Sequence, residues 1–185
     1  MSSADPTALA ARVSAFASAA ALSTTQDLVR LTLPALGPEA TPETVAEETL
    51  VLVSTVTARA AEVGLKATEA VQAVGAALAE LPFLYHDFLL GAEMVASGAE
   101  GDVEPDQSVY QRLSRKADFY GAHLPPGRFP GPRALSDKLP LWMGRVSPPG
   151  LPTTPDQRLG DLGLADVLAA HARLVMAFAQ QAAGA

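Results

Sequence analysis

The densest run of bulky apolar side chains lies between Leu78 and Ala96, and this run constrains the fold more than any other segment. Two of the six phenylalanines fall inside it. Burying one such side chain contributes roughly 1.5–3 kcal/mol, so a core is the expected place for them. We therefore expect residues 78–96 to form a central helix against which the other elements pack. The bulky apolar residues are Leu78, Leu81, Phe83, Leu84, Tyr85, Phe88, Leu89, Leu90, Met94 and Val95.

The clearest helix start in the chain precedes this run. Thr41-Pro42-Glu43 combines a capping hydroxyl, a proline at the first helical position and an acid in the first turn. Apolar residues then recur every three or four positions as far as Val63, which is the spacing of one helix face. We expect Gly64 to end this helix in the left-handed conformation that glycine adopts easily. Residues 42–80 are thus predicted to form an antiparallel helical hairpin.

Similar signals predict helices over most of the remaining chain. Aromatic residues make up only 5% and isoleucine is absent, a composition that suits closely packed helices better than strands. From 125 to 150, seven prolines and four glycines interrupt the pattern, apart from a short helical piece at 135–143. The sequence predicts an all-α, single-domain helical bundle of about six helices over residues 1–185, with a long Pro/Gly-rich loop at 125–150. Besides 42–64, helices are expected at 6–21, 25–36, 67–96 with a kink or break at Pro82, 104–122 and 164–182.

Acidic and basic residues are segregated along the chain. Residues 39–106 contain 13 acids and two bases, whereas residues 108–146 contain seven bases and two acids. The basic segment also carries aromatic residues, and basic residues interleaved with aromatics are typical of sites that bind phosphates and stack bases. The candidate ligand-binding residues are Arg112, Arg115, Lys116, Arg128, Arg133, Trp142 and Arg145.

The same segregation has a second interpretation. The basic segment can lie against the acidic helices of its own chain or of a second subunit. Exposed ion pairs of this kind contribute about 0–1 kcal/mol each, yet they orient elements and select partners. Neither interpretation has a sharp motif behind it, because the chain contains no phosphate-binding or dinucleotide-binding glycine pattern.

Catalytic and metal-binding signatures are weak in this sequence. Cysteine is absent, and so is the Gly-x-Ser-x-Gly pattern of serine hydrolases. The three histidines, His86, His123 and His171, each lie near or within a different predicted helix, and the sequence alone leaves open whether they converge on a metal. They show no ligand-spacing motif, so we predict no metal and no cofactor.

These observations favour a non-enzymatic helical protein that acts through protein–protein contacts, as a structural, adaptor or regulatory module. Self-association, most simply as a homodimer, is the expected partnership. The alternative is a module that binds a phosphorylated ligand or nucleic acid through the basic segment 108–146. A net charge of −7 disfavours a general nucleic-acid binder. No stretch of about 18 uncharged apolar residues is evident, so we expect no membrane partner and a cytoplasmic location.

Overall fold

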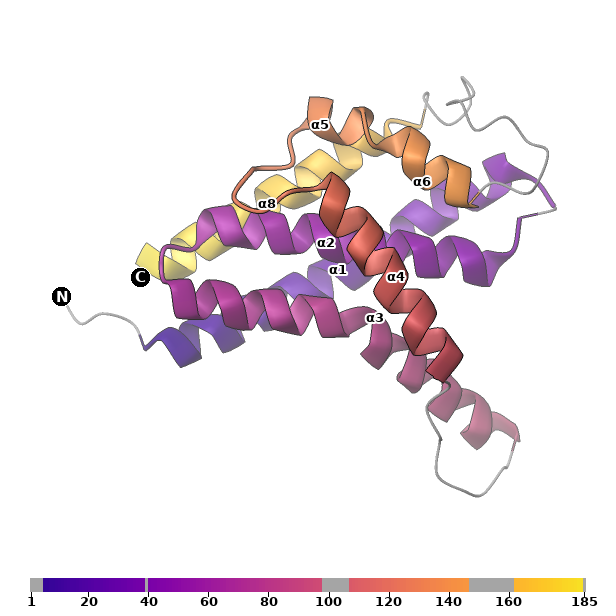
Figure 1. Cartoon of the computed structure of the whole chain (residues 1–185), viewed down its shortest axis with the longest axis horizontal. Helices are drawn as coiled ribbons and strands as arrows, with labels where there is room; N and C mark the ends of the chain where they lie inside the picture. The colour runs from indigo at the N-terminus through magenta and orange to yellow at the C-terminus, as the bar shows by residue number, and fades with distance from the viewer. Residues whose placement is uncertain (1–4, 39, 98–106, 147–161, 185) are drawn as a thin grey trace.

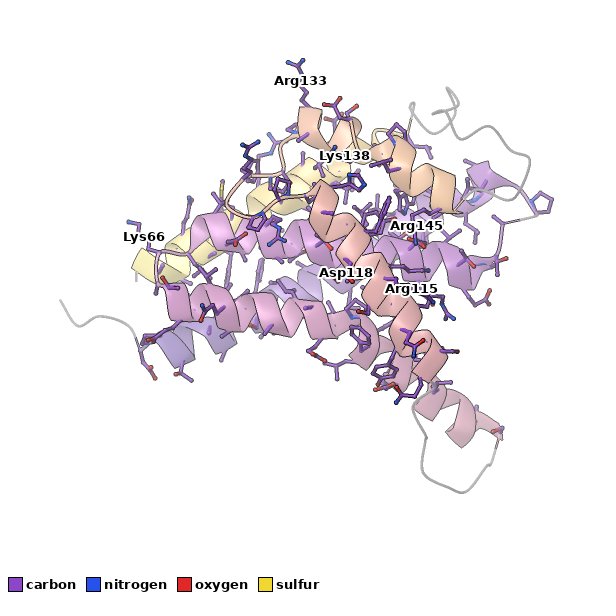
Figure 2. All side chains as sticks on the ribbon, viewed as in Figure 1. Lys66, Arg115, Asp118, Arg133, Lys138 and Arg145 are labelled. Atoms are coloured by element: carbon purple, nitrogen blue, oxygen red, sulfur yellow. The ribbon has the colours of Figure 1, made fainter. Side chains whose placement is uncertain are left out.

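A computed structural model describes residues 5–38, 40–97, 107–146 and 162–184, and in these ranges the chain forms helices and no strand. The prediction of an all-α helical bundle is confirmed (Figure 1). The helices α2 and α3 run antiparallel, as the sequence predicts, and the turn between them contains Lys66 (Figure 2). The helices are α1 (Pro6–Leu36), α2 (Pro42–Gly64), α3 (Thr68–Ser97), α4 (Gln107–His123), α5 (Pro132–Ser136), α6 (Leu139–Val146) and α8 (Leu164–Gly184).

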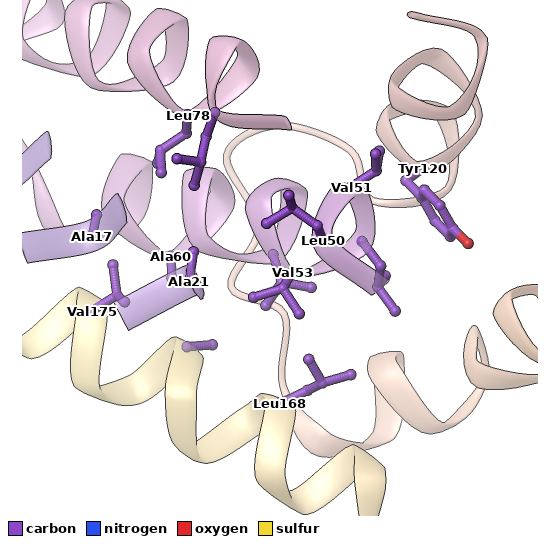
Figure 3. Close-up of a cluster of buried hydrophobic side chains, with 14 of the residues drawn as sticks. Ala17, Ala21, Leu50, Val51, Val53, Ala60, Leu78, Tyr120, Leu168 and Val175 are labelled. Carbon is purple, nitrogen blue, oxygen red and sulfur yellow. The ribbon is translucent and has the colours of Figure 1, made fainter. Parts of the chain in front are cut away.

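Helix α2 is the element that the others enclose. It packs against α1, α3, α4, α6 and α8. Its buried residues cover most of its circumference, including the consecutive run from Glu48 to Ser54. Figure 3 shows Leu50, Val51 and Val53 of α2 in the middle of a cluster to which several other helices contribute. The chain therefore has a central helix, but it is α2 and not the segment richest in large apolar residues.

The expected central position of residues 78–96 is wrong for the outer part of that segment. Leu78 and Leu81 are buried, but Leu84 is 61% exposed, Phe88 69% and Leu89 42%. The outer half of α3 extends beyond the other long helices, with α4 returning beside it (Figure 1). The density of large apolar residues along the chain is thus no measure of enclosure, because neighbours on one side of a helix leave its other side open.

Several element boundaries also differ from the expectations. Residues 6–36 form one helix, within which the side chain of Thr25 donates a hydrogen bond to the carbonyl of Ala21 at 2.8 Å. Helix α3 continues through Pro82. The short piece expected at 135–143 is two helices, α5 and α6, so the described part of the Pro/Gly-rich excursion is substantially helical. The expected start at 104–105 and residues 147–150 lie outside the described residues.

Gly64 has a different role from the one expected. Its backbone is not left-handed, and α2 is closed instead by the amide of Leu65, which donates to the carbonyl of Ala61. A Cβ atom at Gly64 would lie 2.7 Å from both the Met176 carbonyl oxygen and the Ala179 Cβ of α8. Glycine is therefore required here by the close approach of two backbones.

Replacing Gly64 by alanine should destabilise the protein by about 1–3 kcal/mol, because α8 must move away from α2. Gly75 in α3 is the matched control, since a Cβ there meets no atom within 4 Å. Gly75→Ala should stabilise by about 0.5–1 kcal/mol through helix propensity alone. Urea unfolding of the two variants measures both values. Equal effects of the same sign would contradict the close α2–α8 packing.

Candidate functional site

Two consecutive acids near the start of α2, Glu47 and Glu48, receive basic side chains from two other helices. Arg112 of α4 bonds Glu47 through two nitrogens, at 3.0 and 2.9 Å. Lys116, one turn further along α4, contacts a carboxylate oxygen of Glu47 at 2.5 Å and of Glu48 at 2.9 Å. Arg145 of α6 donates to Glu48 at 2.9 Å. The interpretation that the basic segment lies against acidic helices of its own chain is thus confirmed for these three residues.

Glu48 is the centre of this ion network, and only 3% of it is exposed. Besides the two basic residues, it accepts a hydrogen bond from the Tyr120 hydroxyl at 2.9 Å. Lys116 is 6% exposed, and the Arg145 guanidinium lies 4.6 Å from the centre of the Phe119 ring. Buried charges are tolerated when they are paired and hydrogen-bonded, as Glu48 and Lys116 are here.

The proton affinities of the network follow from this pairing. Burial, reinforced by the neighbouring Glu48 carboxylate, raises the pKa of Tyr120 far above its ordinary value. The hydrogen bond that Arg145 donates to Glu48 raises the pKa of Arg145. Burial alone would raise the pKa of Glu47, but the hydrogen bonds and charges of Arg112 and Lys116 outweigh it and lower the pKa. Tyr120, Arg145 and Glu47 therefore hold fixed protonation states near neutral pH, which suits a structural role.

The structure does not gather the seven candidate ligand-binding residues into one surface. Arg112, Lys116 and Arg145 are engaged by the acids of α2. Trp142 is buried at 2% exposure, and within the described residues its indole nitrogen has no hydrogen-bond partner, so stacking on a base is not open to it. The remaining three, Arg115, Arg128 and Arg133, are exposed. Arg115 donates to the carbonyl of Gln111.

The exposed part of α3 is a feature that sequence reasoning assigned to the core. Tyr110 of α4 covers one side of this part, with its ring 5.2 Å from that of Phe83 and its hydroxyl bonded to Asp87. Leu84 and Phe88 point elsewhere and remain exposed. A signal was present in the sequence: apolar residues occur on all sides of the helix between 81 and 90, more than one neighbouring helix can cover.

The three histidines do not form a metal site in the described part of the chain, where no group of three or more metal-ligating side chains occurs. His123 packs against Phe119, with ring centres 4.7 Å apart. His171 is buried between α1 and α2, 2.9 Å from the Thr24 hydroxyl and 2.7 Å from the Thr57 hydroxyl. The convergence that the sequence left open is therefore absent among these residues.

The contacts of His171 define its tautomer. The Thr57 hydroxyl donates its proton to the carbonyl of Val53, so its oxygen accepts from the Nε2–H of His171. The opposite nitrogen, Nδ1, then accepts from the Thr24 hydroxyl. A second ring proton would remove this acceptor. Burial lowers the pKa of His171 to about 4, in agreement with a neutral ring.

One segment of the described residues, Thr68–Leu90, has the length and hydropathy of a membrane-spanning helix, with a mean hydropathy of 1.2 and 22% of its most apolar window buried. This segment is not an uncharged apolar stretch of about 18 residues, which is the feature on which the sequence-based expectation depends. The segment contains Glu69, Glu80 and Asp87. Helices of water-soluble bundles meet the same two criteria, so length and hydropathy alone assign no location.

Comparison of the chain with protein-family models, with curated proteins and with solved structures finds no match.

Lys116→Met should destabilise the protein by about 3 kcal/mol, because the apolar stem is kept while buried Glu48 and half-buried Glu47 lose a cation. Arg112→Met on the same helix is the control. Its side chain is 45% exposed, so the expected cost is below about 1 kcal/mol. Thermal and urea unfolding at neutral pH give both values. A cost below about 1 kcal/mol for Lys116→Met as well would show that the network does not stabilise α4 on α2.

His171 should make folding stability depend on pH between about 6.5 and 4. Its pKa is lower in the folded state than in the unfolded state, so stability is fully present above the unfolded value and is lost as pH falls toward 4, by roughly 3 kcal/mol. His171→Gln should be less stable at neutral pH and lose less stability over this range. Parallel pH profiles for the two proteins would contradict a buried neutral imidazole.

Proposed function

We propose that the protein is a non-enzymatic helical module that associates with a second copy of itself through the outer half of α3. The observation that carries the proposal is the exposure of three large apolar side chains, Leu84, Phe88 and Leu89, on a helix that extends beyond the bundle (Figure 1). Clustered exposed apolar residues of this kind are characteristic of interaction surfaces. The proposal also agrees with the absence of a catalytic motif in the sequence.

The exposed residues form a regular row. Ala76, Glu80, Leu84, Phe88 and Ala92 are all exposed and recur every four positions, and we call this row the α3 stripe. Residues four apart lie on one helix face and form the ridges that interdigitate when two helices pack. Leu84 and Phe88 are adjacent members of the stripe, and the alanines at its two ends leave room for a second helix to approach closely there.

Charge and register favour a second copy in antiparallel orientation. A two-fold axis near His86 places Leu84 of each copy beside Phe88 of the other, and Glu80 opposite Ala92. The two Glu80 carboxylates are then 12 residues apart along the helices, about 18 Å at 1.5 Å per residue. That separation exceeds the screening length of about 8 Å at physiological salt. A parallel pair would place the two Glu80 carboxylates side by side, where their like charges would repel each other and weaken the dimer.

The test is the mass in solution, measured by size-exclusion chromatography with light scattering at low and high salt. The wild-type protein should be a dimer under both conditions, because the contact is apolar. Phe88→Ser and Leu84→Ser should each yield monomer with little change in melting temperature, since both side chains are exposed within one chain. Leu174→Ser is the matched control, because Leu174 is 55% exposed on α8, away from the stripe.

Three results would refute this assignment. One is a wild-type protein that stays monomeric at all concentrations. Another is an equal loss of dimer in the Leu174 and Phe88 variants. The third is a monomer whose stripe is occupied by a different partner, either a basic protein recovered from extract or a lipid vesicle, with binding that Phe88→Ser abolishes.

A further inference from the structure

A cavity of about 310 Å³ lies between the end of α4, the loop that follows it, and the α5–α6 region. Cavities of this size are at the lower end of those that hold small molecules. Its walls consist of apolar side chains that include Phe129 and Pro130, the imidazole of His123, and charged side chains from three separate parts of the chain. The charged residues that line it are Arg59, Arg128, Asp137 and Lys138.

The wall formed by the α4–α5 loop is held in place by contacts with α2. Arg59 donates through Nε to the carbonyl of Leu124 at 2.8 Å and pairs with Glu62 at 3.3 Å. Glu62 in turn accepts the amide of Gly127 at 3.2 Å. Gly127 has φ of 70°, a left-handed conformation that favours glycine. The loop is therefore fixed before any ligand arrives, which reduces the entropic cost of binding.

Positive charge exceeds negative charge among the described residues that line this cavity. Three cationic side chains face one acid, Asp137. Arg59 already pairs with Glu62, but in the part of the chain that the structure describes neither Arg128 nor Lys138 has an acid within 4 Å. In this respect they differ from Arg112, Lys116 and Arg145, which the acids of α2 neutralise. Two cations beside an aromatic ring in a preformed hollow form an anion site with an apolar wall.

We propose that this cavity binds a small organic phosphate, with the phosphate group between Arg128 and Lys138 and an apolar or aromatic body against Phe129 and Pro130. A guanidinium presents paired donors that match phosphate oxygens, and an ammonium adds a point charge. The cavity is too small for a nucleic-acid strand. Three of the basic side chains that a strand would need, Arg112, Lys116 and Arg145, are already paired with acids of α2. The site is independent of the α3 stripe.

The experiment is calorimetric titration of the whole protein with phenyl phosphate at low salt, with inorganic phosphate and a short single-stranded oligonucleotide as comparisons. Phenyl phosphate should bind more tightly than inorganic phosphate, since only it reaches the apolar wall, and the oligonucleotide should not bind. Arg128→Gln and Lys138→Gln should each weaken phenyl phosphate binding about tenfold, the loss expected for one charge-assisted hydrogen bond. Asp137→Asn should strengthen it, because a repelling carboxylate is removed.

Arg133→Gln is the matched control. Arg133 carries the same charge nearby, but it projects outward from α5 and does not line the cavity (Figure 2). Its replacement should change the affinity less than twofold. The proposal is overturned if phenyl phosphate does not bind, if Arg133→Gln weakens binding as much as Arg128→Gln, or if inorganic phosphate binds equally well. Unchanged melting temperatures of the Arg128 and Lys138 variants establish that the loss is one of binding.

Discussion

The enclosure of α2 by helices on nearly all sides is the constraint on which the rest of the structure depends. A helix in this position has little solvent available for its polar side chains, so most of them bond inside the protein, and within the described residues the Ser54 hydroxyl is a buried exception. Thr49 and Thr57 donate to carbonyls of their own helix, and Thr57 also accepts from His171. Glu48 receives three donors from α4 and α6. The buried acid thereby determines where those two helices lie.

The pairing of basic residues with the acids of α2 also determines which basic residues remain available to bind a ligand. The acids of α2 engage three of the seven bases in the segment 108–146, and this pairing leaves a smaller cationic group around the α4–α5 loop. Apolar recognition has a similar origin. Helix α3 is longer than the bundle that it packs on, so its inner half completes the core and its outer half presents Leu84 and Phe88 to solvent. The two proposed binding surfaces therefore consist of apolar and basic side chains that the helical core neither buries nor pairs.

The sequence predicted the fold class and the ends of α2 well, because caps and three-four periodicity are local signals. One of its two interpretations of the charge segregation, pairing with acids of the same chain, holds for Arg112, Lys116 and Arg145, although the sequence did not reveal which residues pair. It failed for the outer part of residues 78–96, because the hydrophobicity of a side chain shows that it favours contact but not whether another helix is close enough to provide that contact. The roles of Gly64 and of the α4–α5 cavity depend on contacts between distant segments, which no local pattern encodes.

Native-state hydrogen exchange of the whole chain tests the central position of α2 most directly. Amides in an enclosed helix exchange only when the protein unfolds globally, whereas those of a projecting helix exchange through local opening. Residues 48–61 should therefore be the most protected in the protein, with an opening free energy equal to that of global unfolding. Residues 84–97 should exchange far sooner. Strongest protection at 84–97, with early exchange at 48–61, would contradict the account.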